Sequence, residues 1–131
     1  EANGNVFYLQ FLHLLSLIKN LTVSGTSTFT GTAVDISQYQ GKLKIMLDSA
    51  AGTGTTPTLN GKIQTGDQSD GSDAADVSGA AFAQITTTAA KEAIGVDSRD
   101  CKKYIRFVGT IAGTTPSFNF AVVAVGQKQI I

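Results

Sequence analysis

The chain has no tryptophan, one cysteine and one histidine among its 131 residues. With Cys101 as the single cysteine, an intrachain disulfide framework is excluded, which fits assembly in a reducing cytoplasm. His13 lies inside an apolar run, so a Ser-His-Asp or Cys-His arrangement would depend on that one imidazole, and a histidine metal site would lack a second ligand of its kind. We therefore expect no enzymatic activity, no catalytic residues and no cofactor, and we interpret Cys101 as a small packed residue.

Charged residues are also scarce. They make up 15% of the chain, and the formal net charge is +0. Sequence-independent binding to nucleic acid needs several uncompensated lysines and arginines, so a nucleic-acid partner is not expected. The short basic stretch at Lys102, Lys103 and Arg106 is interpreted as the solvated edge of a strand. Hydrophobic residues reach 42%, which is enough for the packed core of one domain.

Four aspartates crowd into the segment after residue 64: Asp67, Asp70, Asp73 and Asp76. Their spacing does not match a calcium-binding loop, which has ligands at alternate positions, then glycine, and a glutamate near its end. Asp70 is followed by Gly71, a pair that favours a turn. The segment is therefore predicted to be a solvated turn without a metal site.

Alternation of apolar and polar residues is typical of strands and runs through the middle of the chain. Leu43, Ile45 and Leu47 alternate with polar residues, and the pattern returns after Pro57 and again at residues 104–111. The central strands are predicted at residues 42–48, 58–64, 103–111 and 117–125. Two segments, 50–60 and 112–119, share Ala-Gly, Thr-Thr-Pro and a final Asn, so each is predicted to be the turn of a hairpin. The alternative is that a good turn sequence arose twice.

Weaker patterns surround these strands. Residues 20–36 are rich in threonine and favour strands, residues 37–41 suggest a turn, and residues 80–87 suggest a strand. Residues 88–97 fit a helix as well as a strand. Beyond Asn119, as far as Val125, both faces are apolar, which is typical of a strand buried on both sides or covered by a partner subunit.

The most apolar segment is 6–18, which is too short for a membrane span of ~20 residues. No secretory signal is visible, and no membrane is expected as a partner. A helix would place its large side chains on one face; a strand stays open as the alternative. We expect an N-terminal arm that docks on a neighbouring copy or on a shell, helped by the apolar C-terminal tail. The candidate interface residues are Phe7, Phe11, Leu14, Leu15, Ile18, Ile130 and Ile131.

Five short segments from Gly31 onward have a familiar sequence, at residues 31–41, 47–54, 76–82, 103–110 and 126–128. In these segments the chain resembles small virion proteins of tailed bacteriophages. The resemblance implies a β-sandwich that binds the outside of the head as a decoration or cement protein. Its partners would be the major capsid protein and copies of itself, and it would be made in the host cytoplasm and located on the capsid surface.

These observations together predict an all-β protein, a jelly-roll-like antiparallel β-sandwich with an apolar N-terminal arm. Residues 1–30 are assigned to the arm and first strand, and residues 31–131 to the sandwich. The alternative function is a receptor- or carbohydrate-binding module of a phage tail or head fibre. Sugar sites usually present aromatic faces, whereas Tyr8, Tyr39 and Tyr104 are scattered and tryptophan is absent.

Overall fold

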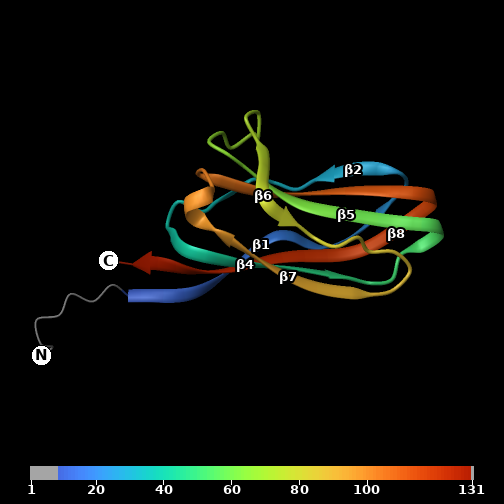
Figure 1. The fold of residues 1–131 in the computed structure, drawn as a ribbon, viewed down its shortest axis with the longest axis horizontal. Helices are drawn as coiled ribbons and strands as arrows, with labels where there is room; N and C mark the ends of the chain where they lie inside the picture. The colour runs from blue at the N-terminus through green and yellow to red at the C-terminus, as the bar shows by residue number, and fades with distance from the viewer. Residues whose placement is uncertain (1–8, 131) are drawn as a thin grey trace, which may run out of the picture.

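The computed structural model describes residues 9–130, with side chains described for residues 14–127. Within these residues the chain is almost entirely antiparallel β structure, which confirms the predicted fold class (Figure 1). The elements are β1 (Leu9–Ser24), β2 (Ser27–Thr30), β3 (Val34–Asp35), β4 (Tyr39–Ser49), β5 (Thr53–Gly66), β6 (Ala75–Ala81), β7 (Ala90–Asp97), the 3-10 turn η1 (Ser98–Asp100) and β8 (Tyr104–Ile130).

The fold is organised around β8, a strand of 27 residues. Residues 39–66, which form β4 and β5, run antiparallel along one side of it, and residues 9–35, which form β1 to β3, run along the other. All of these segments bend near residues 112–117 of β8 (Figure 1, right). The bend folds the sheet over itself, nearly into a barrel. The first layer is β6-β5-β8-β2/β3, and the second layer is β7-β4-β8-β1.

The two Thr-Thr-Pro segments are corners, that is, bends at which the chain passes from one layer to the other. They do not reverse the chain, so the predicted hairpin turns are wrong. β4 and β5 lie end to end along β8, and residues 112–117 lie inside β8 itself. The two segments pair with each other: Thr55 is opposite Thr114, with register shifts on both sides. Thr56 and Thr115 have φ values of 49° and 48°, a conformation that bends a strand without reversing it.

Gly113 shows why the corner sequence needs glycine. Its φ is +126°, and a Cβ built there would lie 2.7 Å from the carbonyl oxygen of Thr56. Gly54, at the equivalent place in the other segment, faces the carbonyl of Thr115 in the same way. Each glycine thus admits the backbone of the opposite corner. The repeated sequence marks two structurally equivalent positions, as predicted, although they are not hairpin turns.

The core lies between the two layers and contains the alternating residues that the sequence singled out. Leu43, Ile45 and Leu47 of β4 are at most 1% exposed, and so are Phe107 and Phe120 of β8. The rings of these two phenylalanines lie 5.7 Å apart, so side chains from the two halves of β8 meet across the core. The predicted strands 42–48, 58–64, 103–111 and 117–125 are confirmed by β4, β5 and β8, except that β8 begins one residue later, at Tyr104.

The side of the sandwich between β6 and β7 is closed by the segment that joins them. The expected strand at 80–87 is replaced by the end of β6 followed by an isolated bridge from Leu59 to Ile85. Phe82 and Ile85 point into the core, at 6% and 4% exposure. The backbone N–H of Ala83 donates to the carboxylate of Glu92 at 2.7 Å. The ambiguous segment 88–97 is largely strand β7.

The N-terminal segment is a strand rather than a helix from Leu9 onward, and its residues 6–8 lie outside the described part. β1 pairs with β8 from Ile130 to Ser117. A lone helix of this length is marginal in water, whereas β8 offers a full row of backbone partners. A register shift after Ser16 places both Leu17 and Ile18 in the core, each 4% exposed. The division at residue 30 stays a prediction.

Candidate assembly surface

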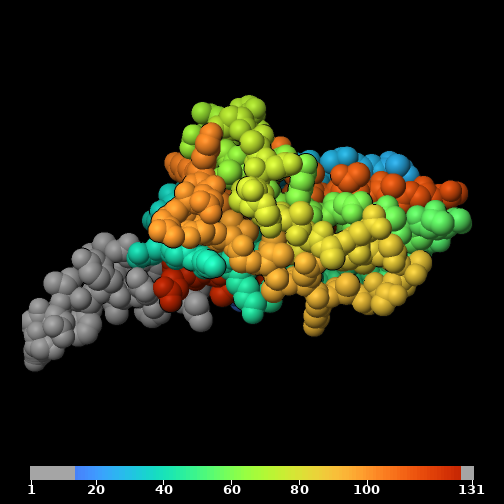
Figure 2. Space-filling model, viewed as in Figure 1, coloured from blue at the N-terminus to red at the C-terminus, as the bar shows by residue number. Residues whose placement is uncertain are grey.

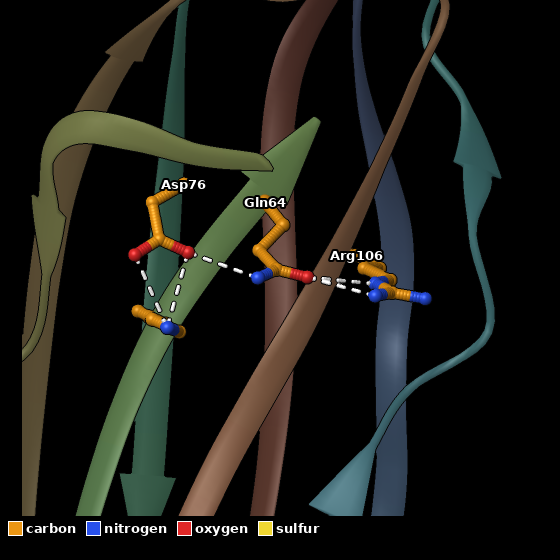
Figure 3. A network of polar contacts seen from close by, with 4 residues as sticks. Gln64, Asp76 and Arg106 are labelled. Atoms are coloured by element: carbon orange, nitrogen blue, oxygen red, sulfur yellow. Dashed lines mark hydrogen bonds and ion pairs between the residues drawn. The ribbon is translucent and has the colours of Figure 1, made fainter. Parts of the chain in front are cut away.

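The outer face of the first layer is polar and internally paired. Asp76 of β6 contacts Lys62 Nζ at 3.0 Å and accepts a hydrogen bond from Gln64 Nε2 at 2.9 Å, both of β5. Gln64 Oε1 in turn accepts two bonds from the Arg106 guanidinium of β8, at 3.0 and 2.9 Å (Figure 3). Val108 on the same face is only 6% exposed, because its neighbours cover it. The outer face of the first layer therefore presents mainly polar side chains to the solvent.

The outer face of the second layer carries an apolar patch bordered by polar and charged side chains. The strand register sets its side chains in rows: Met46 lies opposite Ala93 and Val123, and the next row along holds Val125 beside Leu14. We call this set the outer apolar face. It comprises Leu14, Met46, Ala93, Ala121, Val123 and Val125.

The described part of the chain leaves this face open. Leu14 is 68% exposed, and it is the one large apolar side chain that is mostly exposed among residues 14–127. A shallow hollow of about 480 Å³ lies over the face, lined by Met46, Ala93 and Val123 with Asp48 and Lys91 at its side. In β8, the residues that alternate with Val123, namely Phe120, Val122 and Ala124, point inward and are fully buried. The two-sided apolar pattern predicted beyond Asn119 is thus present: one side lies in the core, and Ala121, Val123 and Val125 on the other side are half-buried.

Charged side chains stand at both ends of the outer apolar face. On β4, Lys44 precedes Met46 by two residues and Asp48 follows it by two. Lys91 lies opposite Asp48, and their charged atoms are 3.9 Å apart with 81% and 62% of the side chains exposed. A pair this long and this exposed contributes little to folding stability. Asp48 therefore keeps much of its capacity to interact with another charged group.

Of the candidate interface residues, the structure places Leu14 on this face. Leu15 is half-buried and packs against the core, and Ile18 is buried in it, so these two point inward rather than outward. The backbones of Phe11 and Ile130 belong to β1 and β8, but their side chains lie outside the described part. Phe7 and Ile131 lie outside it altogether. Met46, Ala93 and Val123 were not predicted as surface residues, although the two-sided apolar run gave a signal for the last.

The acidic segment is a loop between β5 and β6 that stands out from the body (Figure 2). The Asp73 carboxylate accepts hydrogen bonds from the backbone N–H groups of Asp67 and Gln68, at 2.9 and 3.1 Å, and these bonds lower the pKa of Asp73. Asp70 accepts from the N–H of Ser72, which lowers its pKa as well. The carboxylates thus cap the loop's own backbone. Among the described residues, no three His, Cys, Asp or Glu side chains are grouped to hold a metal ion.

Cys101 and the basic residues near it have structural roles or local partners. Cys101 is half-buried, and burial raises the pKa of its thiol, so the thiolate that a nucleophile needs is disfavoured. The basic residues have local partners: Lys102 lies 4.0 Å from Asp67, and the Lys103 ammonium lies 5.5 Å from the centroid of the Tyr104 ring. The His13 side chain lies outside the described part. Within residues 9–130, no helix is long and apolar enough to cross a membrane.

The sequence matches no protein-family model and no curated protein. The fold, however, is similar to parts of solved structures of infectious bursal disease virus. A chain from the virus-derived T=1 particles aligns with a TM-score of 0.61 and 10% identity, covering 92% of this chain and 32% of that one. A chain of the VP2 subviral particle aligns with a TM-score of 0.59 and 9% identity, covering 92% and 33%.

A further structure, of the Gx strain of the virus, gives a TM-score of 0.57 and 11% identity, covering 92% of this chain and 32% of that one. The chain thus spans about a third of the length of each of these proteins. At such identities the likeness concerns the fold. It defines the class as a two-layer antiparallel β-sandwich of the kind found in these virus-particle chains.

Proposed function

We propose that the chain is a structural virion protein that binds the outside of a bacteriophage capsid and stabilises it. The observation that carries the proposal is the likeness in fold, over 92% of this chain, to chains of assembled virus particles. The resemblance of residues 31–131 to small virion proteins of tailed phages supports the same role. The proposed partners are the major capsid protein and further copies of this chain, and the proposed location is the capsid surface.

The outer apolar face supplies a physical basis for such a role. Apolar surface removed from water contributes about 25 cal/mol per Å² to association. A single contact through the outer apolar face is weak, because association also costs translational and rotational freedom. A shell presents many equivalent sites, so copies that bridge neighbouring subunits gain from multivalency. This function needs contact surfaces, and it requires no catalytic group, metal or cofactor.

Binding to heads tests the proposal directly. Purified chain is mixed with heads of the phage whose genome encodes it, the heads having been prepared without the chain, and the mixture is sedimented. We expect saturable co-sedimentation at a copy number set by icosahedral symmetry and a higher temperature of head disruption. Heads that sediment without the chain, or chain that binds isolated tails instead, would refute the proposal.

The alternative of a carbohydrate-binding module gains no support from the described aromatic residues. The Tyr39 ring is 9% exposed and belongs to the core cluster. Tyr104 is half-buried, with the Lys103 ammonium above its ring. Neither presents the open aromatic face on which a sugar ring stacks. Tyr8 lies outside the described part.

A further inference from the structure

We propose that the outer apolar face binds a second copy of this chain, face to face, about a two-fold axis that runs along the row of Ala93, Met46 and Val123. The choice of a second copy as the occupant rests on the proposed function, because shell proteins work as repeated copies. The surface and the geometry rest on the side-chain rows described above.

The apolar row lies in the centre of the face, where two copies would exclude water best. Met46 and Val123 are half-buried and Ala93 is exposed in the single chain. Strands in one layer lie about 4.8 Å apart and packed sheets about 10 Å apart, so two such faces bring their central rows into direct contact. Gly95 lies two residues after Ala93 on the same side of β7, and a Cβ built on it would meet no atom within 4 Å. At Gly95 the strand presents no side chain to another sheet, whereas Lys91, on the same face of β7, projects from the Asp48 end.

The charges at the two ends make the face complementary to itself. Lys44 and Asp48 lie on either side of Met46, four residues and therefore ~13 Å apart along β4. Rotation by 180° about the central row places Lys44 of one copy over Asp48 of the other, and the same contact occurs twice. A face with charges of one sign would repel its copy. Asp48 shares its row with Lys91, so the complementarity rests on the two Lys44–Asp48 contacts. These contacts favour a two-fold homodimer as the occupant of the face.

The first experiment measures association of the full-length chain by analytical ultracentrifugation. Ala93→Arg places a charge in the central row, where pairing would bury it without a partner. We expect the dissociation constant to rise by at least about 30-fold. Thr110→Arg is the matched control: Thr110 is also an exposed strand residue, but it lies opposite Asn60 on the outer face of the first layer. Circular dichroism verifies that both variants fold.

The second experiment tests the two-fold arrangement with charge reversals. Lys44→Asp and Asp48→Lys each turn two attractive contacts into repulsive ones, so each variant alone should dimerise about 5- to 30-fold more weakly. An equimolar mixture of the two should form a heterodimer at close to the wild-type affinity, since every contact is again between opposite charges. A mixture as weak as its components would overturn the two-fold geometry.

A wild-type chain that stays monomeric at all concentrations would overturn the inference. So would an Ala93→Arg variant that dimerises as tightly as the Thr110→Arg control. These outcomes are distinct from failure of the proposed function. If the chain is a monomer and still co-sediments with heads, only the dimer is refuted. If it forms a dimer through this face but does not bind heads, only the capsid role is refuted.

Discussion

The Phe107 ring packs against two glycines in the core and gives a sharp test of the fold. Phe107 is fully buried near the start of β8, and its ring lies 6.1 Å from that of Phe82 and 5.7 Å from that of Phe120, between centroids. A Cβ built on Gly61 would lie 2.6 Å from Phe107 Cε1, and one on Gly109 would lie 2.9 Å from Cε2. The ring therefore occupies space that two glycines leave empty.

Phe107→Ala removes the ring and leaves a cavity that the closed sandwich cannot refill. We expect the free energy of unfolding to fall by about 3–5 kcal/mol. A domain of this size has roughly 5–15 kcal/mol in total, so the variant would be near its limit of stability. At about 3–5 °C per kcal/mol, the melting temperature should fall by ~10–20 °C. Thr110→Ala, at an exposed position of the same strand, should change stability by less than about 0.5 kcal/mol.

Gly61→Ala tests the packing from the opposite side. Its φ is outside the left-handed region, so the expected loss of about 1–3 kcal/mol comes from steric conflict with the Phe107 ring. In the Phe107→Ala background the same methyl group enters the cavity. The double variant should therefore be more stable than the sum of the single effects predicts, by about 1 kcal/mol or more. Urea denaturation measures all four proteins. Additive effects would show that residues 61 and 107 are not in contact and would refute the register of β5 on β8.

Other expected outcomes follow from the same structure. Deleting residues 1–19 should reduce the free energy of unfolding by about 3–6 kcal/mol, because Leu17 and Ile18 leave the core; a truncated chain with unchanged urea midpoint would contradict this. His13→Ala and Cys101→Ala should leave head binding intact, and loss of binding by a folded variant would contradict the structural interpretation. Chelators and calcium should not shift the melting temperature, and a shift of several degrees would indicate a metal site. The pKa of Asp73 is lowered from its ordinary 3.8. Its contribution to the order of the loop is therefore complete above pH ~4 and is lost as the pH falls through the pKa that Asp73 has in the folded chain. Amide exchange at Asp67 and Gln68 should accelerate only in that lower pH range.

The strands were predictable because burial on one face imposes a period of two. Ile45 and Phe107 were recognised as core residues from alternation alone, and both are fully buried. The Thr-Thr-Pro segments were recognised as equivalent but were given the wrong geometry. Glycine, threonine and proline provide the same local conformations for a reversal as for a bend. Which one results depends on Thr55 pairing with Thr114, and that contact joins residues far apart in the sequence.

The surface was harder to predict because it exists only once the register is fixed. Val123 gave a local signal, since its strand is apolar on both sides. Met46 and Ala93 gave none, because neither has an apolar neighbour two residues away on its own side of the strand. They form one row with Val123 only because β4 pairs with β7 on one side and with β8 on the other, each in one register. A shift of one residue would turn Met46 into the core and Ile45 outward. The same pairing that buries Ile45 therefore creates the outer apolar face.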